Sequence, residues 1–192
     1  SPGLDLNNPL LQLDRRDRPI RLSRLSASYA YDGRDNPFDA TTGRYHTADA
    51  TVALRALGGN GQFFRFFTEN QTYHKLPSKF GSAVFAGNFR LGVAANIGPP
   101  IDKILPPNPT DADRKLIPIT ERFFSGGSTT LRGYNFELAG PRNCLQILPD
   151  PNDATKKIVK DCQHTPTAAG SNPIFQLAGG NALMILNAEL RQ

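Results

Sequence analysis

The sequence lacks any long apolar run and is poor in charge and in cysteine. Only 20% of its 192 residues are charged, and two are cysteine. No segment approaches the roughly 18 to 20 consecutive apolar residues that a transmembrane helix needs, which argues against a helical membrane protein. A transmembrane β-barrel is compatible with this composition, because barrel strands alternate apolar and polar residues. The 17 glycines and 16 prolines predict many turns and argue against helical bundles and coiled coils.

The N-terminus also lacks a recognisable leader. Residues 1–19 are polar and without period, and they begin with neither the charged start nor the apolar core of a signal peptide. We interpret them as a loop or ragged start. The chain is therefore either not exported or a processed piece of a longer protein. By length alone it would be one domain or two small ones.

A concentrated basic surface is absent as well. The net charge is +5 and the isoelectric point is about 9.4, values that raise the question of nucleic-acid binding. The densest basic segment, 14–21, also contains Asp14 and Asp17, and no aromatic residues are interleaved with a basic stripe. We expect a solvated loop of mixed charge here and no nucleic-acid partner.

The two cysteines, Cys144 and Cys162, lie in a polar stretch rich in proline, asparagine and aspartate. A metal site needs more ligands at closer spacing, and His164, two residues after Cys162, gives little support for one. A Cys–His catalytic pair would have no motif around it. A disulfide that closes the polar loop is the favoured interpretation, and it would place the chain in an oxidising compartment.

What the sequence does contain is a series of segments with period-two alternation, which is typical of β-strands with one apolar and one polar face. They span about 24–32, 47–55, 62–75, 85–97 and 181–191. In the third segment, the apolar residues Phe63 and Phe67 fall at positions of the polar face, so the two faces are not fully separated. The last segment could also form a helix, because alanine, leucine and methionine favour one. Between the fourth and fifth segments, 98–176 reads as one long irregular region.

The alternation alone does not say whether the apolar faces point inward, as in a soluble sandwich, or outward toward lipid. Two features favour a membrane barrel. The strands are near or above the roughly 9 to 11 residues that span a bilayer. Their polar faces carry charges of both signs, as a wet lumen would. An outward apolar face predicts that Leu54, Phe85, Phe89, Leu91 and Val93 share one uncovered surface.

Within the irregular region lies the segment 121–134, whose letters are ERFFSGGSTTLRGY. A phosphate-binding loop is poorly supported, because the lysine that follows the glycines of such loops is missing. A serine nucleophile has no Gly-x-Ser-x-Gly motif. We find no catalytic triad and expect no enzymatic activity and no cofactor.

This segment resembles the loop-six signature of BamA-type outer-membrane assembly factors, the bacterial surface-antigen barrel superfamily. The matching positions are Phe123, Phe124, Gly126, Gly127, Thr130, Leu131, Arg132, Gly133, Tyr134, Gly140 and Pro141. Residues 31–43 resemble the family's strand–turn–strand motif through Asp32, Arg34, Asp35, Asn36, Pro37, Phe38 and Gly43. Residues 179–191 resemble the strand that follows loop six. The three motifs occur in the family's order over about 20–192.

The resemblance implies an all-β fold, an antiparallel sixteen-stranded barrel in the outer membrane of a Gram-negative-type bacterium, preceded by periplasmic POTRA domains. This chain would supply a partial barrel of about five strands over 20–192, with loop six over about 98–176. Neither a POTRA-like pattern nor the family's final strands are present. The implied function is folding and insertion of β-barrel proteins into the outer membrane. The implied partners are outer-membrane lipid, client barrel proteins and periplasmic assembly lipoproteins.

The resemblance also assigns roles to single residues. Arg132 would reach into the lumen and contact an acidic residue of the wall, and Glu189 matches that wall residue by position. A guanidinium in a confined polar lumen suits a carboxylate partner. Gly133 would permit close approach of the backbone, and Tyr134 would pack the loop tip on the wall. Cys144 and Cys162 would lie in the surface-facing part of the loop.

Other functions stay open at this stage. Within the superfamily, the chain could belong to a translocation paralogue, such as a TamA-like protein or a two-partner secretion pore, or to a barrel fused to a patatin-like lipase. Outside it, a soluble extracellular β-sandwich that binds a partner would show the same alternation but bury its apolar faces against a second layer.

Overall fold

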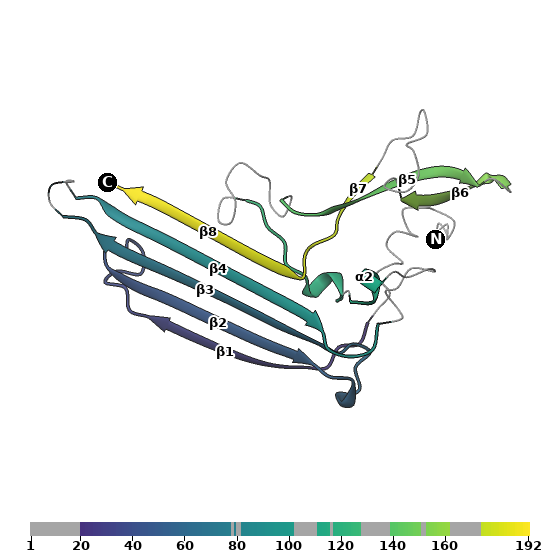
Figure 1. Cartoon of the computed structure of the whole chain (residues 1–192), viewed down its shortest axis with the longest axis horizontal. Coiled ribbons are helices and arrows are strands. Elements are labelled where there is room, and N and C mark those ends of the chain that lie inside the picture. Colours follow the sequence, from purple (N-terminus) through teal and green to yellow (C-terminus); the bar gives the residue numbers. More distant parts are fainter. Residues whose placement is uncertain are drawn as a thin grey trace, which may run out of the picture.

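The computed structural model describes residues 20–77, 79, 82–101, 111–115, 117–127, 139–150, 153–161 and 174–192. Five long strands form one antiparallel sheet in the order β1-β2-β3-β4-β8. Their bounds are β1 Arg24–Asp32, β2 Gly43–Ala53, β3 Phe63–Lys75, β4 Val84–Asn96 and β8 Ala182–Arg191. Figure 1 shows the sheet with the strands running side by side and β8 completing it next to β4. All five predicted strands are therefore present, and the segment 181–191 forms a strand rather than a helix.

The register divides the side chains of the sheet into two faces. One ladder across the five strands joins Ser28, Asp49, Phe67, Gly92 and Leu183 on what we call the inner face. The adjacent ladder, on what we call the outer face, joins Tyr29, Ala48, Thr68, Leu91 and Met184. Successive side chains of a strand point to opposite faces, so these two ladders assign the face of every strand residue.

The outer face leaves its apolar side chains uncovered. Phe85 is 41% exposed and Val93 is 43% exposed. Leu54, Phe89 and Leu91 are partly exposed, so none of the five predicted outward residues is buried. The other exposed large apolar residues on this face are Leu25, Tyr29, Tyr31, Phe64, Met184, Leu186 and Leu190. The apolar faces therefore point outward, as in a barrel wall and unlike a two-layered sandwich.

Two buried clusters lie in the described part of the chain: a small one toward the turn end, of Ala40, Tyr73 and Ala86, and a larger one on the inner face at the opposite end of the sheet. The larger cluster contains Ala53, Phe63 and Ala94 from the strands, with Ile117 and Phe123 from the long segment after β4. Leu22, Phe67 and Leu183 pack against this cluster. The strand residues of the larger cluster lie at the end of the sheet from which the long segment departs, so this cluster holds that segment to the wall.

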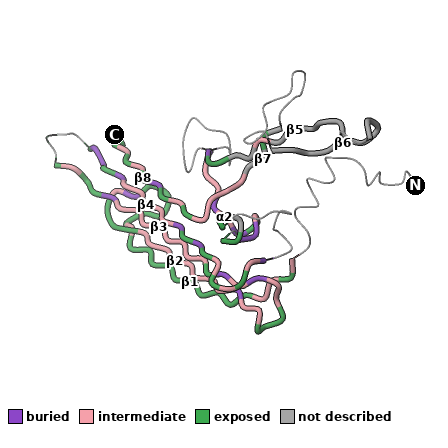
Figure 2. The backbone as a smooth tube through the Cα atoms, turned by 45° about the vertical axis from the view of Figure 1, so that its right-hand side comes forward, coloured by how far each residue is buried: buried purple, intermediate pink, exposed green. Residues whose placement is uncertain are grey.

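The connections divide into two groups at opposite ends of the strands. At the turn end lie the β1–β2 connection, 33–42, and the β3–β4 connection, 76–83. At the loop end lie the β2–β3 connection, with a 3₁₀ turn at Arg55–Leu57, and the long segment 97–181 between β4 and β8. Figure 2 shows both ends of the wall, coloured by burial.

The long segment is more regular than the sequence indicated. It contains a second antiparallel sheet in the order β6-β5-β7, with β5 Arg142–Asp150, β6 Asp153–Asp161 and β7 Ile174–Leu177. It also contains the short helix α2 Asp111–Arg114 and a 3₁₀ turn at Ile119–Glu121. Describing 98–176 as irregular was therefore wrong for these strands. Pro149 lies inside β5, where the register shifts, and the adjacent Lys156 and Lys157 break the alternation of β6.

Candidate functional site at the base of the long loop

The segment 117–127, which we call the loop base, joins the long loop to the inner face of the sheet. Phe123 and Gly180 form an antiparallel bridge in which each backbone N–H donates to the other residue's carbonyl oxygen at 2.9 Å. Ser125 and Ala139 form a second bridge, with the Ala139 N–H donating to the Ser125 carbonyl at 2.9 Å. The first bridge fastens the loop base to the residues that lead directly into β8.

Phe123 is the apolar anchor of the loop base. Phe123 is 6% exposed, and its ring lies against β4 at Gly92, where an added Cβ would lie 2.7 Å from the ring. The guanidinium carbon of Arg65 lies 4.7 Å from the ring centroid, and the ring of Phe67 lies 6.2 Å away at an interplanar angle of 27°. Gly92 therefore leaves the space that the Phe123 ring occupies, and a cation–π contact adds to the packing.

Arg122 fixes the backbone around this anchor. Its Nε donates to the carbonyl of Ile117 at 2.9 Å, and one terminal nitrogen donates to the carbonyl of Ala178 at 2.7 Å. Next along the chain, the ring of Phe124 lies close to Gly179. Charged donors make stronger hydrogen bonds than neutral ones, so Arg122 locks the loop base to the approach of β8.

Glu121 connects the loop base to β1, the edge strand opposite β8 in the described sheet. Its carboxylate oxygen accepts a hydrogen bond from a terminal nitrogen of Arg24 at 2.6 Å, although the two residues are distant in sequence. Glu121 is 8% exposed, whereas half of the Arg24 side chain faces solvent. A buried carboxylate needs such a partner, so the pair ties the loop base to β1 as well as to β4 and β8.

A second ion pair lies on the inner face and joins β3 to β4. One carboxylate oxygen of Glu69 accepts from Arg90 at 3.0 Å, from Asn88 at 3.0 Å and from Gln71 at 2.8 Å. Gln71 in turn accepts from the Tyr73 hydroxyl at 2.9 Å. Between this network and Phe123 lies an open pocket of about 420 Å³, which Arg65, Phe67, Leu183 and Arg122 also line. The inner face is thus polar and charged, whereas the outer face is mainly apolar.

The turn motif 32–43 is held by its own side chains. Arg34 donates from Nε and a terminal nitrogen to the two carboxylate oxygens of Asp32, at 2.9 and 2.7 Å, and to the carbonyl of Pro37 at 3.1 Å. Asn36 accepts from the backbone N–H of Phe38 at 3.0 Å, and Phe38 itself is 99% exposed. The first six predicted residues of the motif, from Asp32 to Phe38, therefore form one ordered turn.

Asp35 closes the same turn. It accepts from the Thr41 hydroxyl at 2.5 Å and from the backbone N–H groups of Thr41 and Thr42 at 2.9 and 3.1 Å. These donors, the Thr41 hydroxyl first, hold the pKa of the Asp35 carboxyl well below its usual range. Gly43 follows with φ of +103°, and a side chain there would collide with the carbonyl of Gly33. That conformation and that close approach explain why the motif ends in glycine.

The comparison with family models decides the membership of the chain. The model of the Omp85 superfamily domain matches residues 5–192. The chain belongs to the Omp85 superfamily. Members of this superfamily are outer-membrane β-barrels that generally serve transport or assembly, and some are fused to enzymes. The apolar outer face and polar inner face described above are those of such a barrel wall.

Among solved structures, this Omp85 chain is similar to BamA from Haemophilus ducreyi lacking POTRA domains 1–3. The identity is 15%, the TM-score is 0.49, and the match covers 88% of this chain and 42% of that chain. The chain thus spans less than half the length of the solved protein. Within the described part of this Omp85 chain, no helix is long and apolar enough to cross a membrane.

The structure describes some of the predicted loop-six residues and not others. Phe123 and Phe124 pack at the loop base as described above, and Gly126 and Gly127 have φ of +126° and +93°. Leu131, Arg132, Gly133 and Tyr134 lie outside the described residues. The contact between Arg132 and Glu189 therefore stays a prediction.

Glu189 itself lies on the inner face of β8, as predicted. Its cross-strand neighbour on β4 is Ala86. Its Oε2 lies 3.8 Å from Nε of Arg191, and the Arg191 guanidinium also lies 5.5 Å from the centroid of the Tyr73 ring. The Glu189 carboxylate therefore lies on the inner face, and its predicted contact with Arg132 stays a prediction.

Cys144 lies in β5 of the second sheet and is disulfide-bonded. Cys162, its predicted partner, lies outside the described residues, so the pairing stays a prediction. The small sheet that carries Cys144 belongs to the long loop at the loop end.

Sequence reasoning missed two ion pairs of the inner face, Arg24–Glu121 and Glu69–Arg90. The signal for the second was present, because Glu69 and Arg90 fall on the polar faces of consecutive strands. The pairing depends on the register between the strands, which the alternation does not give. The contact between Arg24 and Glu121 depends on how the loop base packs on the sheet. No local sequence pattern indicates that packing.

Proposed function

We propose that this chain is part of the barrel domain of a BamA-like factor that folds and inserts β-barrel proteins into the outer membrane. The observation that carries the proposal is the attachment of the signature segment to the inner wall. Phe123, Arg122 and Glu121 fasten its start to β4, β8 and β1. In this proposal the segment that follows enters the lumen, where Arg132 would meet the wall.

In this proposal the loop acts as a strap. It links β1, at one edge of the described sheet, with β8 at the other edge. Such a strap would hold the wall in shape while strands elsewhere in the full barrel separate to receive a client. The work would come from barrel strain and strand pairing. Neither a cofactor nor a nucleotide takes part.

The proposed partners follow from that role. Lipid of the outer membrane would cover the outer face, and unfolded barrel proteins would be the clients. Periplasmic assembly lipoproteins would bind POTRA domains that precede the barrel in the full-length protein. The chain's own residues would act by positioning, and we propose no catalytic group among them.

The test uses the full-length protein in proteoliposomes with a urea-denatured outer-membrane barrel as client. Folded client is measured by its heat-modifiable mobility on a gel. Arg132→Glu and Glu189→Arg should each slow client folding, and the charge-swapped double variant should restore it. If the pair contributes about 1.5–3 kcal/mol to the active state, its loss should slow client folding by roughly tenfold or more. Lys79→Glu, an exposed change in the β3–β4 connection, is the control.

The alternatives predict different results. If the wild-type protein leaves client folding unchanged but exports a secreted passenger across the bilayer, the chain belongs to a translocation paralogue. If both single variants assemble clients at the wild-type rate, the role of Arg132 is wrong even when the wild type is active. Failure of the double variant to recover would show that Glu189 is not the partner of Arg132.

A further inference from the structure

The outer face carries one polar area within its apolar surface. On β2 and β3, the outward side chains near the turn end are polar or basic. They form what we call the polar patch: Arg44, His46, Thr68, Asn70, Thr72 and His74. Toward the loop end, the same two strands return to the apolar outward residues Ala50, Val52, Phe64 and Phe66.

The polar patch is not the edge of the apolar band. His46 is paired with Tyr31 of β1, and His74 is paired with Phe85 of β4. Phe85 is paired in turn with Leu190 of β8, which is 69% exposed. At the level of the patch, the strands on both sides therefore still present apolar side chains to the surroundings. Polar groups that face hydrocarbon without partners are costly. We therefore expect a polar group from the surroundings to bind at this area.

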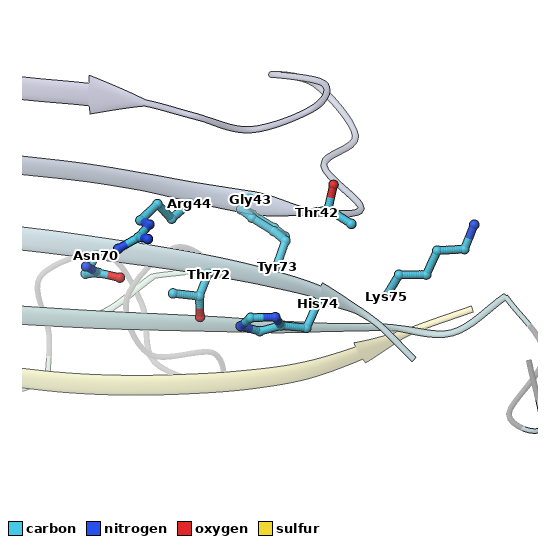
Figure 3. A pocket seen from close by; sticks show the side chains of 8 residues that line it. All are labelled: Thr42, Gly43, Arg44, Asn70, Thr72, Tyr73, His74 and Lys75. Atoms are coloured by element: carbon cyan, nitrogen blue, oxygen red, sulfur yellow. The ribbon is translucent and has the colours of Figure 1, made fainter. Parts of the chain in front are cut away.

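The surface is hollowed at the patch. One hollow of about 580 Å³ is lined by Arg44, Asn70, Thr72, His74 and Lys75 among others, and Figure 3 shows these side chains along the neighbouring strands. An adjoining hollow of about 610 Å³ shares Asn70 and Thr72. Gly87 opens this second hollow, because a Cβ at that position would lie 3.1 Å from the hydroxyl oxygen of Thr72.

The second hollow is amphipathic across its width. Its β2–β3 side is formed by His46, Thr68, Asn70 and Thr72. Its β4–β8 side is formed by the outward residues Phe85, Phe89, Gly87, Leu186 and Ala188. A ligand that fills it would therefore place a polar group against β2 and β3 and an apolar part against β4 and β8.

The charge of the patch is of one sign. Its side chains are basic or neutral, and the nearby carboxylates of Glu69 and Glu189 belong to the inner face. Asn70 contacts His46 at 3.3 Å, and Thr68 donates to the carbonyl of Thr47 at 2.8 Å. Within the described part of the chain, no hydrogen bond uses the side chains of Arg44, Thr72 or His74. These donors suit an anion such as a phosphate group.

We propose that the polar patch binds the phosphate headgroup of a phospholipid, with one acyl chain lying over β4 and β8. Short turns of outer-membrane barrels face the periplasm and long loops face outward. The patch lies toward the turn end, so the ligand belongs to the periplasmic leaflet, whose phospholipids carry this headgroup. The inference rests on the orientation of an Omp85 barrel wall and not on the insertase activity.

The test measures lipid bound to the full-length protein in a phosphate-free maltoside detergent, using native mass spectrometry. The probe is dioleoylphosphatidylglycerol, compared with dioleoylglycerol, which lacks the phosphate. The double variant Arg44→Gln/His74→Gln should weaken phospholipid binding by about tenfold, the effect of losing charged hydrogen bonds of about 1.5–3 kcal/mol. Dioleoylglycerol should bind weakly to every variant.

Two further variants separate the proposal from nonspecific attraction. Gly87→Val fills the amphipathic hollow without changing any charge and should also weaken binding. Lys79→Gln removes a charge from the same end of the sheet but outside the patch and should leave binding unchanged. The heat-modifiable gel shift of each variant confirms that its barrel is folded before binding is compared.

Several outcomes would overturn the proposal. Equal phospholipid retention in wild type, the double variant and Gly87→Val would show that the patch does not hold the lipid. Competition by millimolar inorganic phosphate would indicate a site for phosphate alone. A photo-reactive residue at Thr72 that cross-links in membranes to another protein, and not to lipid, would make the patch a protein interface.

Discussion

The ring of Phe123 lies on the inner face against Gly92, in the space that a side chain at residue 92 would fill. The two residues come from the loop base and from β4, and their contact fixes where the long loop meets the wall. Arg65 and Phe67 surround the same ring. This contact is the apolar centre of the candidate site, and changing either partner should release the loop.

Gly92→Val should displace Phe123 and loosen the loop base. Overpacking of this kind costs about 1–3 kcal/mol. The expected result is a lower guanidinium midpoint of the folded barrel and faster protease cleavage within 98–176. Ala95→Val, on the exposed outer face of the same strand, is the matched control and should change neither quantity. Equal cleavage of both variants would contradict the anchoring role.

The Arg24–Glu121 pair should contribute a measurable coupling between β1 and the loop base. Because half of the Arg24 side chain is exposed, we expect a coupling free energy of only about 1 kcal/mol. The measurement is a double-mutant cycle with Arg24→Ala and Glu121→Ala, followed by guanidinium unfolding. Glu121→Ala alone should cost less than removing Phe123. A coupling of zero would show that the pair does not tie the two elements together.

The strands were predictable because the constraint on them is local. A strand with lipid on one side and a lumen on the other must alternate, and the predicted segments 24–32 and 62–75 nearly coincide with β1 and β3. The direction of the apolar face was predicted with less support, from strand length and mixed charge. The exposed Phe85 and Val93 confirm it.

The loop base could not be predicted, because its contacts join residues far apart in the chain. Phe63 and Phe67 were noticed only as exceptions to the alternation of β3. They lie on the inner face, where Phe63 is fully buried and Phe67 lies beside Phe123. An apolar residue on the polar face of a barrel strand can mark where a loop returns to the wall. The sequence does not say which loop returns there.

Acidification should weaken the β1–β2 turn through Asp35. Its pKa is lowered in the folded turn by the donors of Thr41 and Thr42, so the ionised form is the stabilised one. The contribution is complete above the ordinary aspartate pKa of about 4 and is lost as the pH falls through the lower folded value. Protection of the Thr41 and Thr42 amides from hydrogen exchange should follow this course in the wild type.

Asp35→Asn should lower that protection at neutral pH, and the difference from wild type should narrow as the pH is lowered below about 4. Asp39→Asn is the control. It lies in the same turn and is exposed, and its carboxylate makes no hydrogen bond within the described part of the chain. A difference that stays constant down to strongly acidic pH would show that Asp35 acts without its charge.

Glu69 should be the most sensitive polar position of the inner wall. One of its oxygens accepts from Arg90, Asn88 and Gln71, so Glu69→Ala leaves three donors without that acceptor. Unsatisfied buried donors cost about 1–3 kcal/mol, and more when one is charged. We expect a loss of about 2 kcal/mol or more in guanidinium unfolding, and a smaller loss for Glu69→Gln, which keeps one oxygen.

The matched control for Glu69 is Asp49→Ala, on the inner face of β2. Asp49 accepts from the hydroxyl of Ser28 at 2.6 Å, in an exposed contact. Water can replace that single donor, so the loss should stay below about 1 kcal/mol. If the two alanine variants were equally destabilised, the network around Glu69 would add nothing beyond an ordinary surface hydrogen bond. If Glu69→Ala were much the more damaging, the inner wall would depend on this network for its stability.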